Sequence, residues 1–345
     1  MKTERIDVHD DDLCRRAYEV LDASHGFERP WHEPDPLEAT VIAWRHEDKD
    51  EPMELWGAFD GEALVGVAKI WVPQSDNTDK LFVEVEVDPR QRGRGAGSAL
   101  AQRISRRAHE EQRASVIAES LVPPGASSAW PEHPYLRFAQ KQGYALASSE
   151  AMRHLPLPVA DELLDRLEAH ARLAWEGDYR LETYVDGVPP ALQEDYWRLD
   201  GLVSVDAPTG DVDFEPMVMT EERYRDHLDV DARQGVHTLT TLAVHADSGR
   251  AVAYTDLRVP GGEGRTIVWQ SGTLVDQAHR GHRLGMAVKV ANLRRLQSDF
   301  PERRFVRTGN SDANSWMLAI NEQLGFRLVE ECPMLQLDVG ASAAD

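Results

Sequence analysis

Several short segments of the chain alternate apolar and polar residues, and longer segments between them repeat apolar residues every three or four positions. In the clearest alternation, Val83, Val85 and Val87 are separated by Glu84 and Glu86. Because successive side chains of a strand point to opposite faces, this pattern predicts a strand with one apolar face. Its other face carries two neighbouring carboxylates.

A turn rich in glycine and arginine links this strand to a predicted helix over residues 98–109, with Leu100 and Ile104 toward the interior. The glycines therefore lie at a helix N-terminus, where free backbone N–H groups and the helix dipole attract anions. Residues without a Cβ let the backbone approach a phosphate closely. The predicted phosphate-binding turn consists of Arg92, Gly93, Arg94, Gly95, Ala96, Gly97 and the first helical residue, Ser98.

A second turn of the same kind follows a predicted strand over residues 266–275 and precedes a predicted helix over 284–296. Its last residue, Gly285, follows Gly97 by 188 residues (285 − 97), about half of the 345-residue chain. Such a spacing predicts one fold present twice. The second turn consists of Arg280, Gly281, His282, Arg283, Leu284 and Gly285.

The remaining pattern predicts a mixed α/β fold in each half. We expect an N-terminal domain over 1–158, a linker helix within 159–177 and a C-terminal domain over 178–345. Strands are predicted at 5–8, 55–59, 64–72, 81–87, 114–119, 144–147, 152–157, 179–185, 239–244, 252–259, 266–275, 305–308 and 334–338. Further helices are predicted at 11–21, 136–142, 161–173, 189–199, 221–229 and 315–324, and a loop at 205–214.

Composition and charge exclude several classes of protein. The net charge of −22 argues against a nucleic-acid or anionic-membrane partner. No apolar stretch reaches the length of a membrane span, and the acidic start of the chain does not resemble a signal peptide. The two cysteines, Cys14 and Cys332, lie one in each half, which favours a reducing cytoplasm over a disulfide scaffold. We expect no metal cofactor.

The first turn and the end of a later helix carry a family resemblance. Arg92, Gly95 and Gly97 fill the pattern R-x-x-G-x-G/A, and Gly143-Tyr144 follows a helix downstream, as Gly325-Phe326 does in the second half. This combination resembles the GCN5-related N-acetyltransferases (GNAT), and the repeat resembles their tandem members, distantly those like mycothiol synthase. A dinucleotide-binding domain fits less well, because antiparallel hairpins precede the turn.

The resemblance implies two tandem GNAT folds, each a mixed, mostly antiparallel sheet flanked by helices. It implies acetyl-CoA as cosubstrate and transfer of its acetyl group to an amine, which we expect to be a small molecule. In the resembled family the strand before the turn separates from its neighbour and binds the cofactor through its backbone. The corresponding residues are Val85, Val87, Leu274 and Val275.

Candidate catalytic residues are Glu84 and Glu86, carboxylates that can accept a proton from the acceptor, and a raised pKa would mark the base. Their alternative role is as solvated residues on a half-exposed strand. The family's usual acid is a tyrosine four residues before the Gly-Tyr or Gly-Phe pair, and Ala139 and Asn321 stand there. Tyr135, one helical turn earlier, is the remaining candidate acid, although ordinary packing also explains it.

The two copies differ at their turns. Arg283 replaces Gly95, and its side chain should crowd a pyrophosphate unless the turn opens or the guanidinium pairs with it. Asn314 matches a position where relatives contact coenzyme A, whereas the first half has Glu132. Asn310, Asp312 and Asn314 also fit simple loop and N-cap roles.

We therefore expect one working and one degenerate domain. Residues 22–50 and 205–235 should line the acceptor pockets. We expect a monomer whose two domains pack as an internal pseudo-dimer. A non-catalytic acetyl-CoA-binding module and a protein N-acetyltransferase remain alternatives. The sequence does not decide which domain is active, and fold alone does not supply the acceptor.

Overall fold

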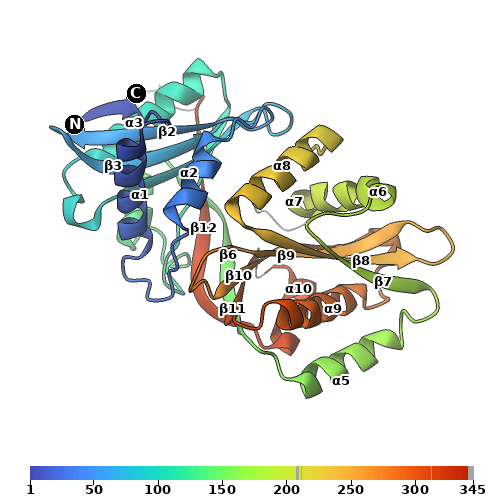
Figure 1. Ribbon diagram of the computed structural model, residues 1–345. Helices are drawn as coiled ribbons and strands as arrows, with labels where there is room; N and C mark the ends of the chain where they lie inside the picture. Colours follow the sequence, from blue (N-terminus) through green and yellow to red (C-terminus); the bar gives the residue numbers. More distant parts are fainter. Residues whose placement is uncertain (207–209, 211, 312, 341–345) are drawn as a thin grey trace. The chain divides into compact units, whose positions relative to one another are not determined.

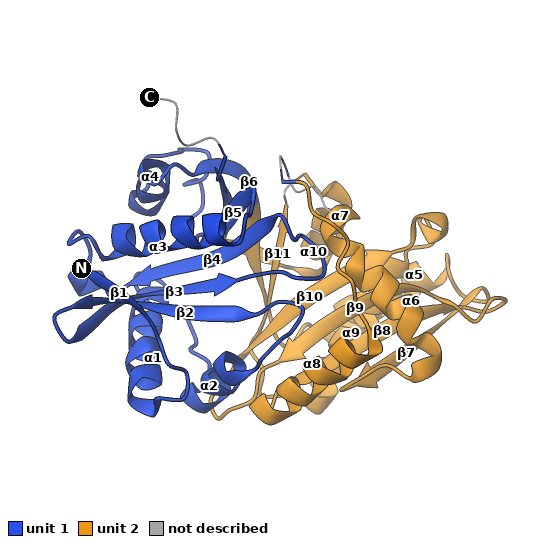
Figure 2. Ribbon diagram, turned by 90° about the horizontal axis from the view of Figure 1, so that it is seen from above, with its two compact units in different colours: residues 1–149, 210–212, 331–345 blue, residues 150–209, 213–330 orange. Residues whose placement is uncertain are grey.

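The computed structural model describes residues 1–206, 210, 212–311 and 313–340. The chain folds into two compact units (Figures 1 and 2). Unit 1 comprises residues 1–149, 210–212 and 331–345, and unit 2 comprises 150–209 and 213–330. Both contain a mixed sheet with helices against it, which confirms the predicted fold class. Among the described helices, none has the length and apolar character needed to cross a membrane.

Unit 1 has a sheet in the order β1-β2-β3-β4-β5-β12, in which β4 and β5 pair in parallel and the other described pairs are antiparallel. Its elements, in chain order, are β1 (Lys2–Arg5), α1 (Asp11–His25), α2 (Leu37–Arg45), β2 (Met53–Asp60), β3 (Ala63–Trp71), β4 (Lys80–Val87), the 3-10 turn η1 (Pro89–Gln91), α3 (Ala96–Glu110), β5 (Ser115–Glu119), α4 (Pro134–Lys141) and the start of β6 (Ala145–Pro156), with the end of β12 (Arg327–Asp338).

Two apolar cores cover the opposite faces of this sheet (Figure 2). On one face, Leu100 and Ile104 of α3 pack against residues such as Val83. On the other, α1 and α2 pack on β2 and β3, and Val67 is fully buried beneath them. The alternation that predicted β4 therefore points its valines toward α3 and its glutamates toward the α1 side.

The last strand of each unit comes from the other half of the chain. In unit 1, β12 pairs with β5 from Met334↔Glu119 to Asp338↔Ser115. In unit 2, β6 pairs with β11 from Glu150↔Ser311 to Pro156↔Phe305. The two strands predicted at 144–147 and 152–157 are one continuous strand, because residues 148–151 keep the extended backbone. Nothing in the sequence pattern indicates this exchange.

Unit 2 repeats the arrangement with the order β6-β11-β10-β9-β8-β7. Its elements are the remainder of β6, α5 (Asp161–Arg172), β7 (Tyr179–Val185), α6 (Pro190–Gly201), α7 (Val203–Asp206), α8 (Glu221–Gln234), β8 (His237–His245), β9 (Ala251–Val259), β10 (Ile267–Val275), the 3-10 turn η2 (Gln277–His279), α9 (Leu284–Asp299), β11 (Phe305–Ser311), α10 (Ser315–Leu324) and the start of β12. The helix α5 precedes β7 and packs against α9.

Three local predictions need correction. The strand predicted at 5–8 ends at Arg5, because Asp7 bonds the backbone of His9 and turns the chain before Asp10 caps α1. Helix α2 was not predicted, and α7 (Val203–Asp206) overlaps only the first two residues of the predicted loop at 205–214. Residues 207–209 and 211 of that loop lie outside the described residues.

A buried lysine lies in the core of unit 2. Lys289 of α9 is 2% exposed, and its ammonium donates to Asn321 Oδ1 at 3.1 Å. Asn321 in turn donates to Asn310 Oδ1 at 3.1 Å. Burial lowers the pKa of Lys289 to about 7. Asn321, at the position of the family's tyrosine, is thus part of an internal polar chain.

We predict that Lys289→Met stabilises the protein, most strongly at low pH. The folded-state pKa of Lys289 is below the ordinary value, so the unfolded chain binds more protons between about pH 7 and about pH 10.4, and stability rises with pH across that window. Below about pH 7 the charge stays buried, and its removal should stabilise by about 1–3 kcal/mol. Denaturant unfolding of the wild type and variant at pH 6 and pH 10 measures the difference.

The exposed Lys141→Met serves as the matched control and should leave stability unchanged. Equal stability of wild type and Lys289→Met at pH 6 would show that the buried ammonium carries no cost.

Candidate active site

The strand β4 has a free edge in its second half. It pairs with β3 as far as Gly66↔Val87, whereas its described ladder with β5 ends at Val83↔Ala118. Backbone groups of residues 84–87 on that side are therefore unpaired with β5 and can bind an extended ligand, except Val87 O, which accepts from Arg92. This is the separation of strands that the resemblance implied for Val85 and Val87.

The turn after β4 presents backbone N–H groups outward. Gly93 and Gly95 have φ values of +78° and +95°, which glycine adopts without strain. The first α3 bond runs from Ala99 N to Gly95 O at 3.0 Å, so the preceding amides have no acceptor within the helix. A Cβ at Gly93 or Gly95 would meet nothing within 4 Å, which leaves room for a phosphate. At Gly97 it would lie 2.9 Å from Phe138, so this glycine serves the packing of α4.

The Arg92 guanidinium points into unit 1. Its Nε donates to Val87 O at 3.2 Å, Nη1 to Tyr135 Oη at 2.7 Å and Nη2 to Ser24 Oγ at 2.8 Å. It also lies 4.9 Å from the ring centroids of Phe27 and Tyr135. Arg92 therefore braces the turn between α1 and α4, while Arg94 is exposed beside the amides.

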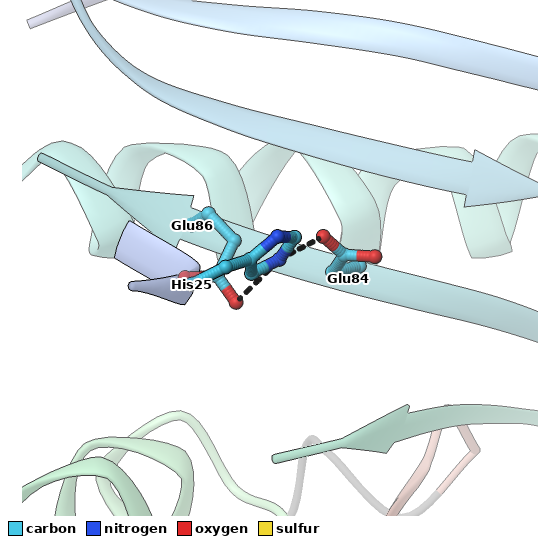
Figure 3. Close-up of side chains that lie close together, drawn as sticks. All are labelled: His25, Glu84 and Glu86. Atoms are coloured by element: carbon cyan, nitrogen blue, oxygen red, sulfur yellow. Dashed lines mark hydrogen bonds and ion pairs between the residues drawn. The ribbon is translucent and has the colours of Figure 1, made fainter. Parts of the chain in front are cut away.

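Glu84 and Glu86 lie together against the C-terminal end of α1 (Figure 3). His25 Nε2 is 2.9 Å from Glu84 Oε1 and 3.7 Å from Glu86 Oε1. Lys69 Nζ from β3 is 3.1 Å from Glu84 Oε2, and Ser24 donates to Glu86 Oε2. The two predicted carboxylates thus face one imidazole but have different second partners.

These partners separate the pKa values of the two carboxylates. Burial opposes ionisation of Glu84, but the Lys69 ammonium and the bond to His25 outweigh it and lower the Glu84 pKa to about 2. Burial raises the pKa of Glu86 above its ordinary value, since the opposing effects of His25, Ser24 and Arg92 are smaller and Glu84 adds negative charge. Two carboxyls with divergent pKa values are the usual sign of separate acid–base roles.

The surroundings of His25 favour its protonated form. Burial disfavours its charge, yet the bond to Glu84 and the charges of Glu84 and Glu86 raise its pKa above the ordinary value. One nitrogen of His25 and one oxygen of each glutamate lie within 4.8 Å of one another, a set that can ligate a divalent cation. Because the Lys69 ammonium already lies against Glu84, we interpret the cluster as a proton-handling site.

Three contributors to the cluster were not among the predicted residues. Ser24 and His25 lie on the last turn of α1, one turn beyond the predicted helix end at residue 21. The spacing of Val20 and buried Ser24 could have extended that prediction. Lys69 is the cross-strand partner of Glu84, which the hairpin register could have indicated.

Tyr135, the candidate acid, lies at the start of α4. Its hydroxyl accepts from Arg92, and its ring packs edge-on against His133 with centroids 4.7 Å apart. The hydroxyl is therefore connected through Arg92 to Ser24 and Glu86. Ala139, at the family's tyrosine position, is buried in the core of unit 1.

The second turn keeps the backbone of the first. Arg283 adopts φ +55° where Gly95 has a positive φ, and Ala287 N donates to Arg283 O. Its guanidinium does not crowd the turn, because Nη1 donates to His170 O of α5 at 2.7 Å. Gly281 also keeps a positive φ, and a Cβ on Gly285 would lie 3.1 Å from Ile320. His282 Nδ1 lies 3.2 Å from Ala174 O.

The strand before the second turn also separates from its neighbour. β10 pairs with β9 as far as Val275↔Ala253, whereas its described ladder with β11 ends at Trp269↔Arg307. Leu274 and Val275 lie on the free edge. Arg280 Nε donates to Val275 O at 3.3 Å, as Arg92 does to Val87 O.

In unit 2, buried tyrosines pack where unit 1 has its two carboxylates. Gly272 stands where unit 1 has Glu84 (84 + 188), and a Cβ on it would lie 2.0 Å from Tyr254 Oη. Tyr254 donates to Asp200 Oδ1 at 2.7 Å, and Tyr196 donates to Asp256 Oδ2 at 2.8 Å. Burial and the charge of Asp200 raise the pKa of Asp256 to about 7. These groups pair with one another inside the core.

Asn314 is an N-cap residue, one of the two roles that its sequence position left open. Its Oδ1 accepts from Met317 N at 3.1 Å and caps α10. Asn310 Oδ1 accepts from Arg153 at 3.2 Å and from Asn321, which in turn accepts from Lys289. Asp312 lies outside the described residues.

Comparison with known proteins agrees with the fold. Residues 16–144 match the profile of the acetyltransferase (GNAT) family. A solved tandem GNAT protein from the clavulanic acid biosynthesis pathway is similar over 99% of both chains, with 23% identity and a TM-score of 0.78. A GCN5-related N-acetyltransferase from Sphaerobacter thermophilus is similar over 98% of this chain and 95% of that one, with 16% identity and a TM-score of 0.62.

Saccharomyces cerevisiae N-myristoyltransferase is similar over 98% of this chain and 78% of its own, with 10% identity and a TM-score of 0.58. No curated protein matches the sequence. The predicted tandem fold is confirmed, and a relation to mycothiol synthase stays a prediction.

We predict that Glu84→Gln lowers the pKa of His25, because it removes the carboxylate at 2.9 Å. Glu86→Gln should lower it less, since that carboxylate lies at 3.7 Å. NMR titration of the histidine ring protons measures both shifts. An unchanged His25 titration in Glu84→Gln would contradict the arrangement.

Proposed function

We propose that unit 1, whose residues 16–144 match the acetyltransferase (GNAT) family profile, transfers an acetyl group from acetyl-CoA to a small-molecule amine. The observation that carries this proposal is the pair of carboxylates with divergent pKa values beside the free edge of β4. The same unit has the glycine turn, so groups for binding the cosubstrate and for proton transfer occur together.

The residues of unit 1 fit acetyl-CoA in two respects. The free edge of residues 84–87 offers backbone groups to the pantetheine amides, and the amides of the glycine turn offer donors to its pyrophosphate. The open space above Gly93 and Gly95 matches the second role. Acetyl-CoA supplies a thioester that an amine can attack without a covalent enzyme intermediate.

Glu86 is the residue we assign as general base. An amine reacts only after losing its proton, and a carboxylate with a raised pKa takes up that proton more readily than an ordinary one. Glu84 is held ionised by Lys69 and keeps His25 in place beside Glu86. Tyr135 is the candidate that returns a proton to the departing sulfur, directly or through water.

The segment that follows α1 favours a small acceptor over a protein. Residues of this segment are tied back to the helix: Tyr18 donates to Asp35 O at 2.7 Å, and His32 Nε2 lies 2.9 Å from Asp22 Oδ1. A segment folded back beside the carboxylates restricts access more than an open groove for a protein tail would. The chain's negative charge also favours attraction of a cationic amine.

Unit 2 is the degenerate copy in this proposal. Its turn and free strand edge are compatible with coenzyme A, through Leu274, Val275 and the amides that follow Arg283. Its acceptor side carries Gly272 and Leu274 in place of Glu84 and Glu86, and Tyr254 fills the space. These features support a second candidate role, a binding site without transfer chemistry.

We predict that Glu86→Gln lowers kcat/KM for amine acetylation by about 10²–10⁴-fold, the usual cost of losing a general base. In the wild type, kcat/KM should rise with pH as Glu86 ionises, with a midpoint above the ordinary glutamate pKa, and the variant should lose this limb. Steady-state rates on a panel of small amines between pH 5 and pH 9 measure both effects.

The exposed Glu62→Gln is the control and should retain wild-type rates. If Glu86→Gln keeps the pH limb, another group is the base.

We predict that Gly95→Asp abolishes acetyl-CoA binding in unit 1. The carboxylate would face the phosphates and repel them, and the left-handed backbone adds strain. Calorimetric titration of acetyl-CoA into wild type, Gly95→Asp and Gly285→Asp gives the stoichiometry of each unit. Gly61→Asp is the matched control, because Gly61 also has a positive φ, +61°, and open space, but lies in the hairpin between β2 and β3.

Full binding by Gly95→Asp together with loss in Gly285→Asp would move the working site to unit 2. No binding by the wild type would exclude the acetyltransferase function.

A further inference from the structure

The Ser24 hydroxyl joins the phosphate-binding turn to the proposed base. It lies 2.8 Å from Arg92 Nη2, and it also bonds Glu86 Oε2. A guanidinium can only donate hydrogen bonds. The Ser24 oxygen therefore accepts from Arg92, and its single proton is directed to Glu86.

Ser24 is fixed from several sides. It is 6% exposed, on the last turn of α1, and Phe27 N donates to its carbonyl at 3.3 Å. Arg92 is held by Val87 O and Tyr135 and lies between two aromatic rings. Because Arg92 immediately precedes Gly93, the position of the guanidinium and the form of the turn depend on each other.

Unit 2 provides an internal comparison. Arg280 occupies the place of Arg92 (92 + 188) and likewise donates to the strand before the turn. Its Nη2, however, binds the Asp206 carboxylate at 2.6 Å, and Leu274 stands where unit 1 has Glu86. The arginine brace is thus common to both units, whereas its connection to a base occurs in unit 1.

We propose that Ser24 is a positioning residue that aligns the Glu86 carboxylate through Arg92, so that the turn which binds the cosubstrate also orients the base. This inference rests on the proposed function of unit 1. It makes Ser24 a determinant of proton transfer although it need not touch either substrate.

The groups that face Glu86 determine how its pKa should change when the Ser24 hydroxyl is removed. They are His25 and Ser24 from α1, Glu84 on the same strand and Arg92 from the turn. Ser24 and Arg92 favour the ionised form, so loss of either should raise the Glu86 pKa. Loss of a donor to a charged group should also lower kcat/KM by about tenfold or more.

The experiment compares wild type, Ser24→Ala, Ser24→Thr and Arg92→Met at full length. Amine acetylation gives kcat/KM against pH, and carbon-13 NMR of glutamate carboxyls, with Glu86→Gln to assign the signal, gives the Glu86 titration directly. We expect Ser24→Ala to move both midpoints upward, Ser24→Thr to restore them and Arg92→Met to move them as Ser24→Ala does. Acetyl-CoA affinity should stay near wild type in Ser24→Ala.

Ser127→Ala is the matched control, because Ser127 is also a buried serine of unit 1 and bonds another side chain, Ser149, at 2.9 Å. It should leave both midpoints unchanged. A purely structural role for Ser24 would lower stability without moving the Glu86 titration, and that result overturns the proposal.

The two readouts separate this inference from the proposed function. If no amine is acetylated but the NMR midpoint still moves in Ser24→Ala, the alignment exists and the function fails. If acetylation is normal and depends on Glu86 while neither midpoint moves, the function stands and the alignment is wrong.

Discussion

The separation of β4 from β5 after Val83 is the constraint on which the candidate site depends. A fully paired strand has no backbone groups to offer, and a strand without any partner would not keep its shape. Pairing with β3 as far as Val87 holds β4 rigid while its other edge stays free. The glycine turn continues from that edge, so a ligand bound along the strand is led to the outward N–H groups of α3. The period-2 alternation then places Glu84 and Glu86 at the same point on the opposite face from the α3 core.

Electrostatics gives the two carboxylates different roles, although the strand presents them in the same way. Lys69 lies against Glu84 and compensates the cost of burying its charge, whereas Glu86 has a hydroxyl and a more distant imidazole. A buried carboxylate without close positive charge binds its proton more strongly. The raised pKa of Glu86 is therefore a consequence of which neighbours α1 and β3 supply. In unit 2 the same location is occupied by two tyrosine–aspartate hydrogen bonds, Tyr196 to Asp256 and Tyr254 to Asp200.

The exchange of terminal strands ties the two halves of the chain to each other's folding. Unit 1 lacks a partner for the outer edge of β5 until β12 is made, and unit 2 takes β6 from the middle of the chain. An unpaired sheet edge is a liability, so each unit depends on residues distant in sequence. Glu331, at the start of the β12 segment in unit 1, also accepts from Gly125 N at 2.6 Å and Ser127 N at 2.9 Å, which holds the loop before α4.

The sequence by itself determined the repeated fold, the strand that carries Glu84 and Glu86, and the position of the two glycine-containing turns. These features are local: alternation along a strand and glycines before a helix leave their mark within a few residues. Tertiary structure decided what sequence spacing cannot express. It brought Ser24 and His25 from α1 to β4, turned the Arg92 guanidinium inward and Arg283 toward α5, and exchanged β6 with β12. Each of these outcomes depends on contacts between segments far apart along the chain, and the pKa difference between Glu84 and Glu86 depends on them in turn, because charge and burial act through space.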